Sequence, residues 1–192
     1  MSQNPVYVSL EFTPNPNTLK YAVNVELLSK GAKNFNVPAE AKNVSPLVEK
    51  IFETAGISGV MVGKDFITVT KSDDGDWDIV HKYTSGLITK WLTDGNPVFT
   101  AEALEALTGT NHSAGSGSEL EQKIKDILDK EIRPAVAMDG GDISFDRFED
   151  GVVFLQMKGS CAGCPSSTMT LKMGIETRLK KAVPEVREVV SV

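Results

Sequence analysis

The chain has 192 residues, enough for one domain or two small ones, and its 41% hydrophobic content suits ordinary cores rather than a long disordered chain. Its formal net charge of −6 argues against nonspecific binding to nucleic acid or to an anionic membrane surface. The sequence shows neither a basic start followed by an apolar stretch nor a long apolar run, so we expect no secretory signal and no membrane span.

Residues 1–95 predict a ββαββα domain. Two prolines in the turn at 13–18 remove backbone donors, so this turn separates two segments that are rich in β-forming residues. Ser45 followed by Pro46 is typical of a helix start. The expected elements are strands over 6–12 and 19–25, a helix from Ser45 to Gly56, a hairpin over 59–70 and a helix over 76–93.

Residues 96–117 are expected to form a flexible linker. A short helix over 101–107 is compatible with its alanine and leucine content, and the Gly- and Ser-rich segment after it is typical of flexible chain. His112 in this segment is a weak metal candidate. His81, within the predicted helix, is expected to be a surface or hydrogen-bonded histidine rather than a ligand.

Residues 118–192 predict a second domain, with the order αββαβ. Ser118 and Glu121 form a capping box for a helix that is expected to end near Arg133 and Pro134. The remaining elements are strands over 143–148 and 152–157, a helix that begins near Pro165, and a strand over 186–192. The predicted fold class is therefore α+β, with two small α/β-sandwich domains joined by a linker.

Cys161 and Cys164 are the chain's only cysteines, and they lie between a predicted strand and a predicted helix. The two small residues between them allow a tight loop that points both sulfurs toward one object. Backbone amides at the helix start are expected to favour thiolate over thiol, and thiolate is the form that binds metal or attacks disulfides. The loop is expected to be exposed.

Three interpretations of this thiol pair are open: a structural pair, a dithiol redox site, or a metal or cluster site. Two thiolates are too few for a closed zinc site or an iron–sulfur cube, which take about four protein ligands. The acidic residues are hard oxygen donors that suit iron–sulfur chemistry poorly. The unusual backbone angles that glycine permits explain the turn at 139–142, so Asp139 and Asp142 are not assigned as ligands. The metal interpretation therefore predicts a dimer around a shared centre.

The residues around the cysteines resemble the C-terminal domain of NifU, the Nfu domain. The matching segments, in order and spacing, are 132–134, 138–143, 159–167 and 170–176. Ser160 is a departure, because the family often has alanine there. The resemblance implies a carrier of iron–sulfur clusters, usually [4Fe–4S] held between two subunits, with Cys161 and Cys164 as the ligands here.

The first domain is similar to the N-terminal domain of Nfu-type scaffold proteins. The segments that carry this similarity are 13–20, 45–47 and 63–69. The absence of any cysteine before Cys161 excludes the cysteine-rich U-type scaffold domain. The two similarities together cover nearly the whole chain apart from the linker.

The expected function is therefore a non-enzymatic scaffold and carrier. It would receive a [4Fe–4S] cluster from a donor scaffold, hold it as a homodimer and pass it to apo iron–sulfur proteins, without nucleic-acid or membrane partners. A thioredoxin-like dithiol redox protein and a zinc-bridged structural dimer are the alternatives. Two closely spaced cysteines without an export signal indicate a reducing compartment, and we expect the cytoplasm.

Overall fold

The structure, a computed structural model, describes residues 5–108, 118–162 and 165–192. The chain divides into two compact units, residues 1–109 (unit 1) and 110–192 (unit 2), and each has its own hydrophobic core. Within the described ranges, none of the helices combines the length and the apolar character that crossing a membrane requires.

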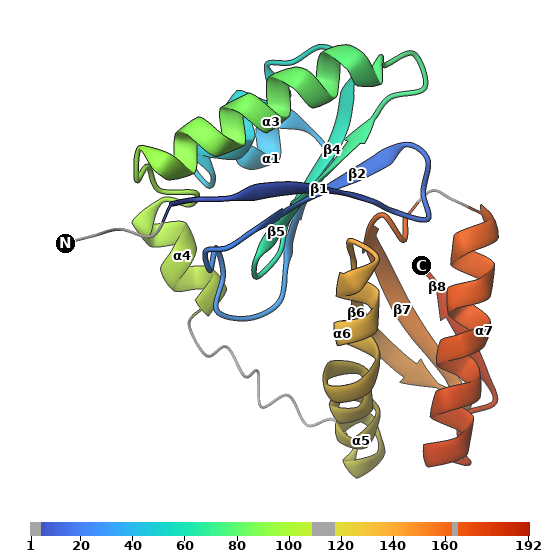
Figure 1. The fold of residues 1–192 in the computed structure, drawn as a ribbon. Helices are drawn as coiled ribbons and strands as arrows, with labels where there is room; N and C mark the ends of the chain where they lie inside the picture. Colours follow the sequence, from blue (N-terminus) through green and yellow to red (C-terminus); the bar gives the residue numbers. More distant parts are fainter. Residues whose placement is uncertain (1–4, 109–117, 163–164) are drawn as a thin grey trace. The chain divides into compact units, whose positions relative to one another are not determined.

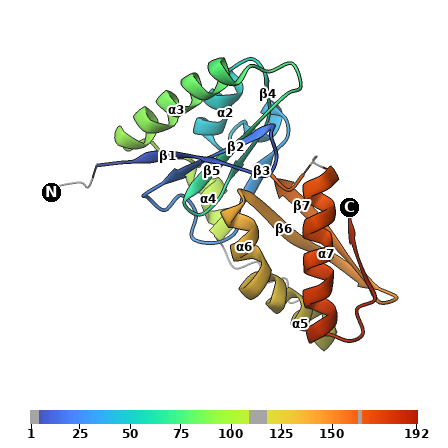
Figure 2. The same cartoon turned by 45° about the vertical axis from the view of Figure 1, so that its right-hand side comes forward.

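Unit 1 is an antiparallel five-stranded sheet with the order β1-β2-β5-β4-β3. Helices α2 and α3 lie on one face of this sheet (Figures 1 and 2). The strands are β1 Val8–Phe12, β2 Thr18–Val23, β3 Lys33–Phe35, β4 Ile57–Val62 and β5 Phe66–Lys71. The helices are α1 Pro38–Ala41, α2 Pro46–Phe52, α3 Trp77–Thr93 and α4 Ala101–Thr108.

The predicted cap of α2 is confirmed. The Ser45 hydroxyl accepts a hydrogen bond from the Val48 amide at 3.3 Å, and Pro46 occupies the first helical turn. The apolar side of the helix is completely buried, through Leu47, Val48 and Ile51. The short elements β3 and α1 lie between residues 25 and 45, where the sequence predicts no helix or strand.

Unit 1 continues beyond residue 95. Val98 and Phe99 belong to its core, and the Ser45 hydroxyl donates to the Val98 carbonyl at 2.6 Å. The Thr100 amide donates to the Val44 carbonyl at 3.0 Å, and α4 packs against the same core through partly buried side chains. Residues 98–108 are therefore part of a folded unit, although they were predicted as linker. The rest of the predicted linker, 109–117, lies outside the described residues.

Both tryptophans lie in unit 1, partly buried against its core. The indole N–H of Trp77 donates to the Pro16 carbonyl at 3.1 Å, and that of Trp91 donates to the Pro97 carbonyl at 3.1 Å. Each indole is thus tied to a proline-containing loop as well as to the core.

Unit 2 is a three-stranded sheet with one face covered by helices (Figures 1 and 2). Strand β7 is central, antiparallel to β6 and parallel to β8, so that β7, α7 and β8 form a βαβ unit. The elements are α5 Glu119–Ile127, the π-helix η1 Leu128–Ile132, α6 Arg133–Met138, β6 Gly141–Glu149, β7 Val152–Gly159, α7 Pro165–Ala182 and β8 Glu188–Ser191. The α+β class is confirmed.

The helix that opens unit 2 was expected to end near Arg133 and Pro134, but it does not end there. It continues to Met138 through the π turn η1 directly before the proline. Proline cannot donate to residue i−4 and its ring crowds that carbonyl, and a wider turn accommodates both effects. The helix therefore reaches the loop at Asp139, which contacts the cysteine segment.

Candidate functional site

Cys161 lies just beyond the end of β7 and just before α7. The chain turns after Gly159, whose φ of 63° favours glycine, and the Ala162 amide donates to the Gly159 carbonyl at 3.0 Å. The predicted position of the motif between a strand and a helix is therefore confirmed for Cys161. Its predicted partner Cys164 lies outside the described residues, and its role as a ligand stays a prediction.

A second loop, between α6 and β6, supports the cysteine segment. The Ser160 hydroxyl donates to the Asp139 carbonyl at 2.5 Å, and the Ser160 amide donates to the Gly140 carbonyl at 3.2 Å. The Ser160 oxygen also lies 3.9 Å from the Cys161 sulfur. Ser160, where the family often has alanine, thus joins both loops and touches the thiol.

Gly141 packs directly against the Cys161 thiol. It pairs with Gly159 at the first position of the β6–β7 ladder, and an added Cβ atom would lie 2.2 Å from the Cys161 sulfur. The sequence interpretation explained the glycine pair by backbone angles alone. Gly140 has a φ of 76°, but the requirement at Gly141 is space for the sulfur. The sequence alone does not give the β6–β7 register that places Gly141 next to the Cys161 sulfur.

The Cys161 thiol is buried, which contradicts the expected exposed loop. The residue is 6% exposed and belongs to the core of unit 2. Burial raises the pKa of the Cys161 thiol to about 11, the Ser160 hydroxyl opposes this rise, and the Asp139 and Asp142 carboxylates add to it. The thiolate expected from the helix start is therefore disfavoured, because desolvation is the larger effect.

Asp142 next to this site is also buried, and it pairs with Arg133. The Arg133 Nε lies 3.0 Å from the Asp142 Oδ1, and its Nη2 donates to the Ile143 carbonyl at 2.8 Å. Burial raises the pKa of the Asp142 carboxyl, and the Arg133 charge opposes that rise. Arg133 also contacts Asp129 at 2.6 Å, so one guanidinium ties the long helix to the start of β6. Sequence inspection had assigned no such role to Arg133.

No group of three or more His, Cys, Asp or Glu side chains within the described ranges has the arrangement of a metal site. The His81 Nδ1 lies 3.2 Å from the Tyr21 hydroxyl, with the two rings stacked, which agrees with a hydrogen-bonded histidine in unit 1. His112 lies outside the described residues. The described part of unit 2 thus offers one thiol, that of Cys161.

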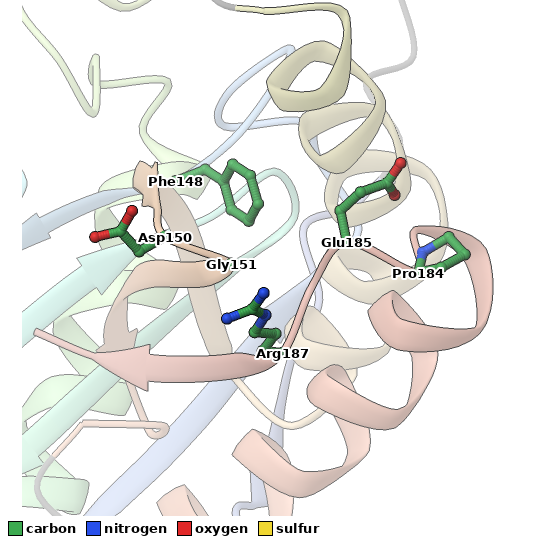
Figure 3. Close-up of a pocket in the computed structure, with 6 residues that line it drawn as sticks. All are labelled: Phe148, Asp150, Gly151, Pro184, Glu185 and Arg187. Atoms are coloured by element: carbon green, nitrogen blue, oxygen red, sulfur yellow. The ribbon is translucent and has the colours of Figure 1, made fainter.

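A hollow of about 630 Å³ lies at the other end of the β6–β7 hairpin (Figure 3). Phe148, Asp150 and Arg187 line it, together with Gly151, Pro184 and Glu185. Its charged residues are exposed and of both signs. Because the hairpin turn is far along the strands from Gly141 and Gly159, this hollow is separate from the cysteine site.

Two domain families match the chain. The N-terminal family of scaffold protein Nfu/NifU matches residues 8–95, and the NifU-like domain family matches residues 124–190. The chain is 38% identical to the mitochondrial NFU1 iron-sulfur cluster scaffold homolog of Homo sapiens over 96% of this chain and 71% of that protein. It is 38% identical to the Drosophila grimshawi homolog over 95% of this chain and 60% of that protein.

A solution structure of a NifU-like protein from Saccharomyces cerevisiae is similar, with 28% identity, a TM-score of 0.46, and coverage of 53% of this chain and 90% of that one. The arrangement of two domains, with an Nfu N-terminal unit before a NifU-like unit, defines the class of Nfu-type proteins. The chain belongs to the NFU1 family of iron–sulfur cluster scaffold homologs. It spans about 60% of the length of the Drosophila grimshawi relative.

The expected cytoplasmic location is wrong, because these relatives are named as mitochondrial. The cysteine argument concerned the redox environment, and a reducing environment does not identify one compartment.

Proposed function

We propose that this protein carries an iron–sulfur cluster on Cys161 and Cys164 and transfers it to apo-proteins. The cargo is a [4Fe–4S] cluster held between two chains, which form a homodimer when loaded. The cluster comes from a donor scaffold and goes to apo iron–sulfur proteins. No covalent bond of an organic substrate is broken, so the role is that of a carrier and not of an enzyme.

The observation that carries this proposal is the position of Cys161 at the β7–α7 junction of the NifU-like unit, with one soft donor among its described residues. Cys164 supplies the second thiol of each chain. A cube takes about four protein ligands, so two chains supply a complete set. The membership of a family of cluster scaffold homologs gives the chemistry of the cargo.

Loading requires the Cys161 thiol to leave its buried position and to lose its proton. The thiolate is the form that binds iron, and burial opposes its formation. Each bond to iron therefore releases one proton to solvent. During transfer, an acceptor thiolate forms a bond to iron as one carrier thiolate leaves and takes up a proton. The return of Cys161 to its place above Gly141 then favours release.

Burial of the Cys161 thiol hinders the dithiol redox alternative as much as it hinders cluster loading, and membership of a family of cluster scaffold homologs favours the cluster carrier. A redox cysteine needs an accessible thiolate near neutral pH, and here burial raises the thiol pKa. The zinc alternative uses the same ligands, and spectroscopy separates it from a cluster.

The test is anaerobic reconstitution with iron and sulfide, followed by absorption and Mössbauer spectroscopy. We expect a [4Fe–4S] signal and about one cube per two chains, because four thiolates complete the site. Cys161→Ala and Cys164→Ala should each abolish stable loading. A normal cluster load in either variant would remove that residue from the ligand set, and a colourless protein with bound zinc would favour the structural dimer.

Oligomeric state is the second readout. Light scattering after anaerobic size-exclusion chromatography should give a monomer for the apo-protein and a dimer after loading. A fully loaded monomer would contradict the shared site and would require ligands from outside this chain.

A further inference from the structure

Helix α7 presents an exposed face that carries no charge over two turns. Met169 and Met173 are 67% and 63% exposed and lie one helical turn apart, so they point to the same side. Thr170, Gly174 and Thr177 are exposed on this side as well. We call these five residues the α7 face. Large exposed apolar groups on one helix side indicate a contact surface.

The charged residues of α7 nearby are satisfied within unit 2. Lys172 contacts Glu188 at 3.4 Å, and Glu176 contacts Lys180 at 2.5 Å. The Thr177 hydroxyl donates to the Met173 carbonyl at 2.8 Å, so it does not depend on water for a partner. A Cβ atom added at Gly174 would meet nothing within 4 Å, which leaves room for another chain to approach.

The α7 face lies beside the cysteine loop. Met169 is in the first turns of the helix that begins at Pro165, directly after the loop. On the other side of the loop, Met138 at the end of α6 is 76% exposed and precedes Asp139, whose carbonyl binds Ser160. The ends of α6 and α7 lie at the same end of unit 2 (Figures 1 and 2). An exposed methionine thus lies near each of the two helix ends that adjoin the Cys161 segment.

We propose that the α7 face, together with Met138, is the subunit contact of the loaded homodimer. This inference rests on the proposed function: a cluster shared by two cysteine loops brings the surfaces beside those loops against each other. The site is incomplete without the second copy, because one chain has two cysteines and a cube takes about four protein ligands.

The absence of charge favours a second copy over a different protein. Near the twofold axis of a symmetric dimer, a residue approaches its own copy, so any charge there meets a like charge. The five residues of the α7 face meet this requirement. The exposed Arg178, directly after Thr177, pairs with Glu131, and the exposed Lys180 and Lys181 lie further along the helix. Methionine is flexible and polarizable, so it fills the irregular space around a cluster that comes and goes.

The test uses the full chain with Met169→Glu and Met173→Glu together, which places four carboxylates in the proposed contact. After anaerobic reconstitution, we expect the concentration at which half of the loaded protein is dimeric to rise at least about tenfold, equivalent to about 1.4 kcal/mol. Ile79→Glu is the matched control, because Ile79 is 62% exposed on helix α3 of unit 1. Circular dichroism checks that each apo-variant is folded.

Charge complementation decides whether any loss comes from the contact itself. Chains with Met173→Glu and chains with Met173→Lys, each impaired alone, should form loaded heterodimers when mixed. Unchanged dimerisation of the double variant, or impaired single variants that stay impaired when mixed, would overturn the α7 contact. If the wild-type protein is fully loaded as a monomer, the shared-cluster function itself fails, and that result is distinct from a wild-type dimer that tolerates the glutamates.

Discussion

Cys161 combines two properties that oppose each other: it is the soft donor of unit 2, and its side chain is 6% exposed. A buried thiol is protected from oxidation and binds no iron, whereas an exposed thiolate binds iron and is open to oxidation. The fold therefore keeps the thiol neutral and packed against Gly141, and the proposed cluster loading would require a local opening. The sequence placed Cys161 correctly between strand and helix, but its burial depends on packing against β6, which is distant in the chain.

The stored thiol predicts a pH dependence of stability in the apo-protein. The pKa is raised from 9.0 to about 11 in the folded state, so the neutral thiol stabilises the fold relative to the unfolded chain. This contribution is fully present below about pH 9 and is lost as the pH rises through about 11. Because other groups titrate there too, the measured quantity is the difference in unfolding free energy between wild type and Cys161→Ala.

At about pH 8, Cys161→Ala should be less stable by about 1–2 kcal/mol, because it removes a buried sulfur. The difference should shrink or change sign near pH 11, since the full pKa shift corresponds to about 2–3 kcal/mol. Urea unfolding followed by circular dichroism measures both values. A difference that stays constant with pH would show that the thiol is not buried in the apo-protein.

Gly141→Ala tests the space beneath the sulfur. The added methyl group would lie 2.2 Å from the Cys161 sulfur, so the thiol or β6 must move. We expect unit 2 to lose about 1–3 kcal/mol, as in other overpacked cores, and cluster loading to change with the displaced thiol. Gly86→Ala is the control, because its Cβ atom would meet nothing within 4 Å. Iron and sulfide content per chain gives the loading, and wild-type behaviour of Gly141→Ala would contradict the contact.

At the scale of elements, the opening helix of unit 2 is held to the sheet by Arg133. Its interactions with Asp129, Asp142 and the Ile143 carbonyl join α6 to β6 next to the cysteine loop. The sequence predicted the start of this helix correctly through its capping box, but not its continuation past Pro134. A π turn has no pattern of apolar spacing that would reveal it, and a proline normally ends a helix.

Arg133→Met should destabilise unit 2 by about 3–5 kcal/mol, because it leaves the Asp142 carboxylate buried without its partner. Lys130→Met on the same helix removes an exposed pair with Asp126 and should cost less than about 1 kcal/mol. Adding Asp142→Asn to Arg133→Met should recover part of the loss. Far-UV circular dichroism during urea unfolding follows both units, and tryptophan fluorescence, which reports unit 1 alone, allows the transition of unit 2 to be separated. Equal effects of the two single variants would refute the role of Arg133.

Elements with a clear turn or spacing pattern were predictable from the sequence, and very short elements were not. The hairpin of β6 and β7 was predictable because Asp150 and Gly151 both adopt positive φ, 50° and 81°, in a two-residue turn. Strand β3 has three residues and α1 has four, which is too short for either periodicity to show. Val98 and Phe99 were assigned to a linker because no pattern signals that an isolated apolar pair returns to a core.

At the scale of the whole molecule, the boundary of unit 1 is testable. A fragment of residues 1–108 should fold, whereas a fragment of residues 1–95 loses Val98, Phe99 and the carbonyl that binds Ser45. We expect the shorter fragment to be less stable by at least about 3 kcal/mol, because two buried side chains are removed. Urea unfolding of both fragments, followed by circular dichroism, measures this difference. Equal stability would show that Val98 and Phe99 do not contribute to the fold of unit 1 and belong to a linker.

Unit 2 alone should carry the cluster. Both proposed ligands and the whole core of this unit lie after residue 118. A fragment of residues 118–192 should therefore fold and reach the same iron and sulfide content per chain as the full protein. A folded fragment that takes up no cluster would show that unit 1 contributes directly to loading.

Both tryptophans lie in unit 1, and each indole N–H is hydrogen-bonded to a proline carbonyl. Their fluorescence can therefore report the distance between unit 1 and a cluster on unit 2. Iron–sulfur clusters absorb in the region where indoles emit, so a cluster on Cys161 would quench Trp77 and Trp91 by energy transfer. Because unit 2 contains no competing indole, the emission lifetime of the loaded protein depends on the separation between the two units. A change in that lifetime when an acceptor protein binds would record, without any added label, how far unit 1 moves while the cargo is still in place.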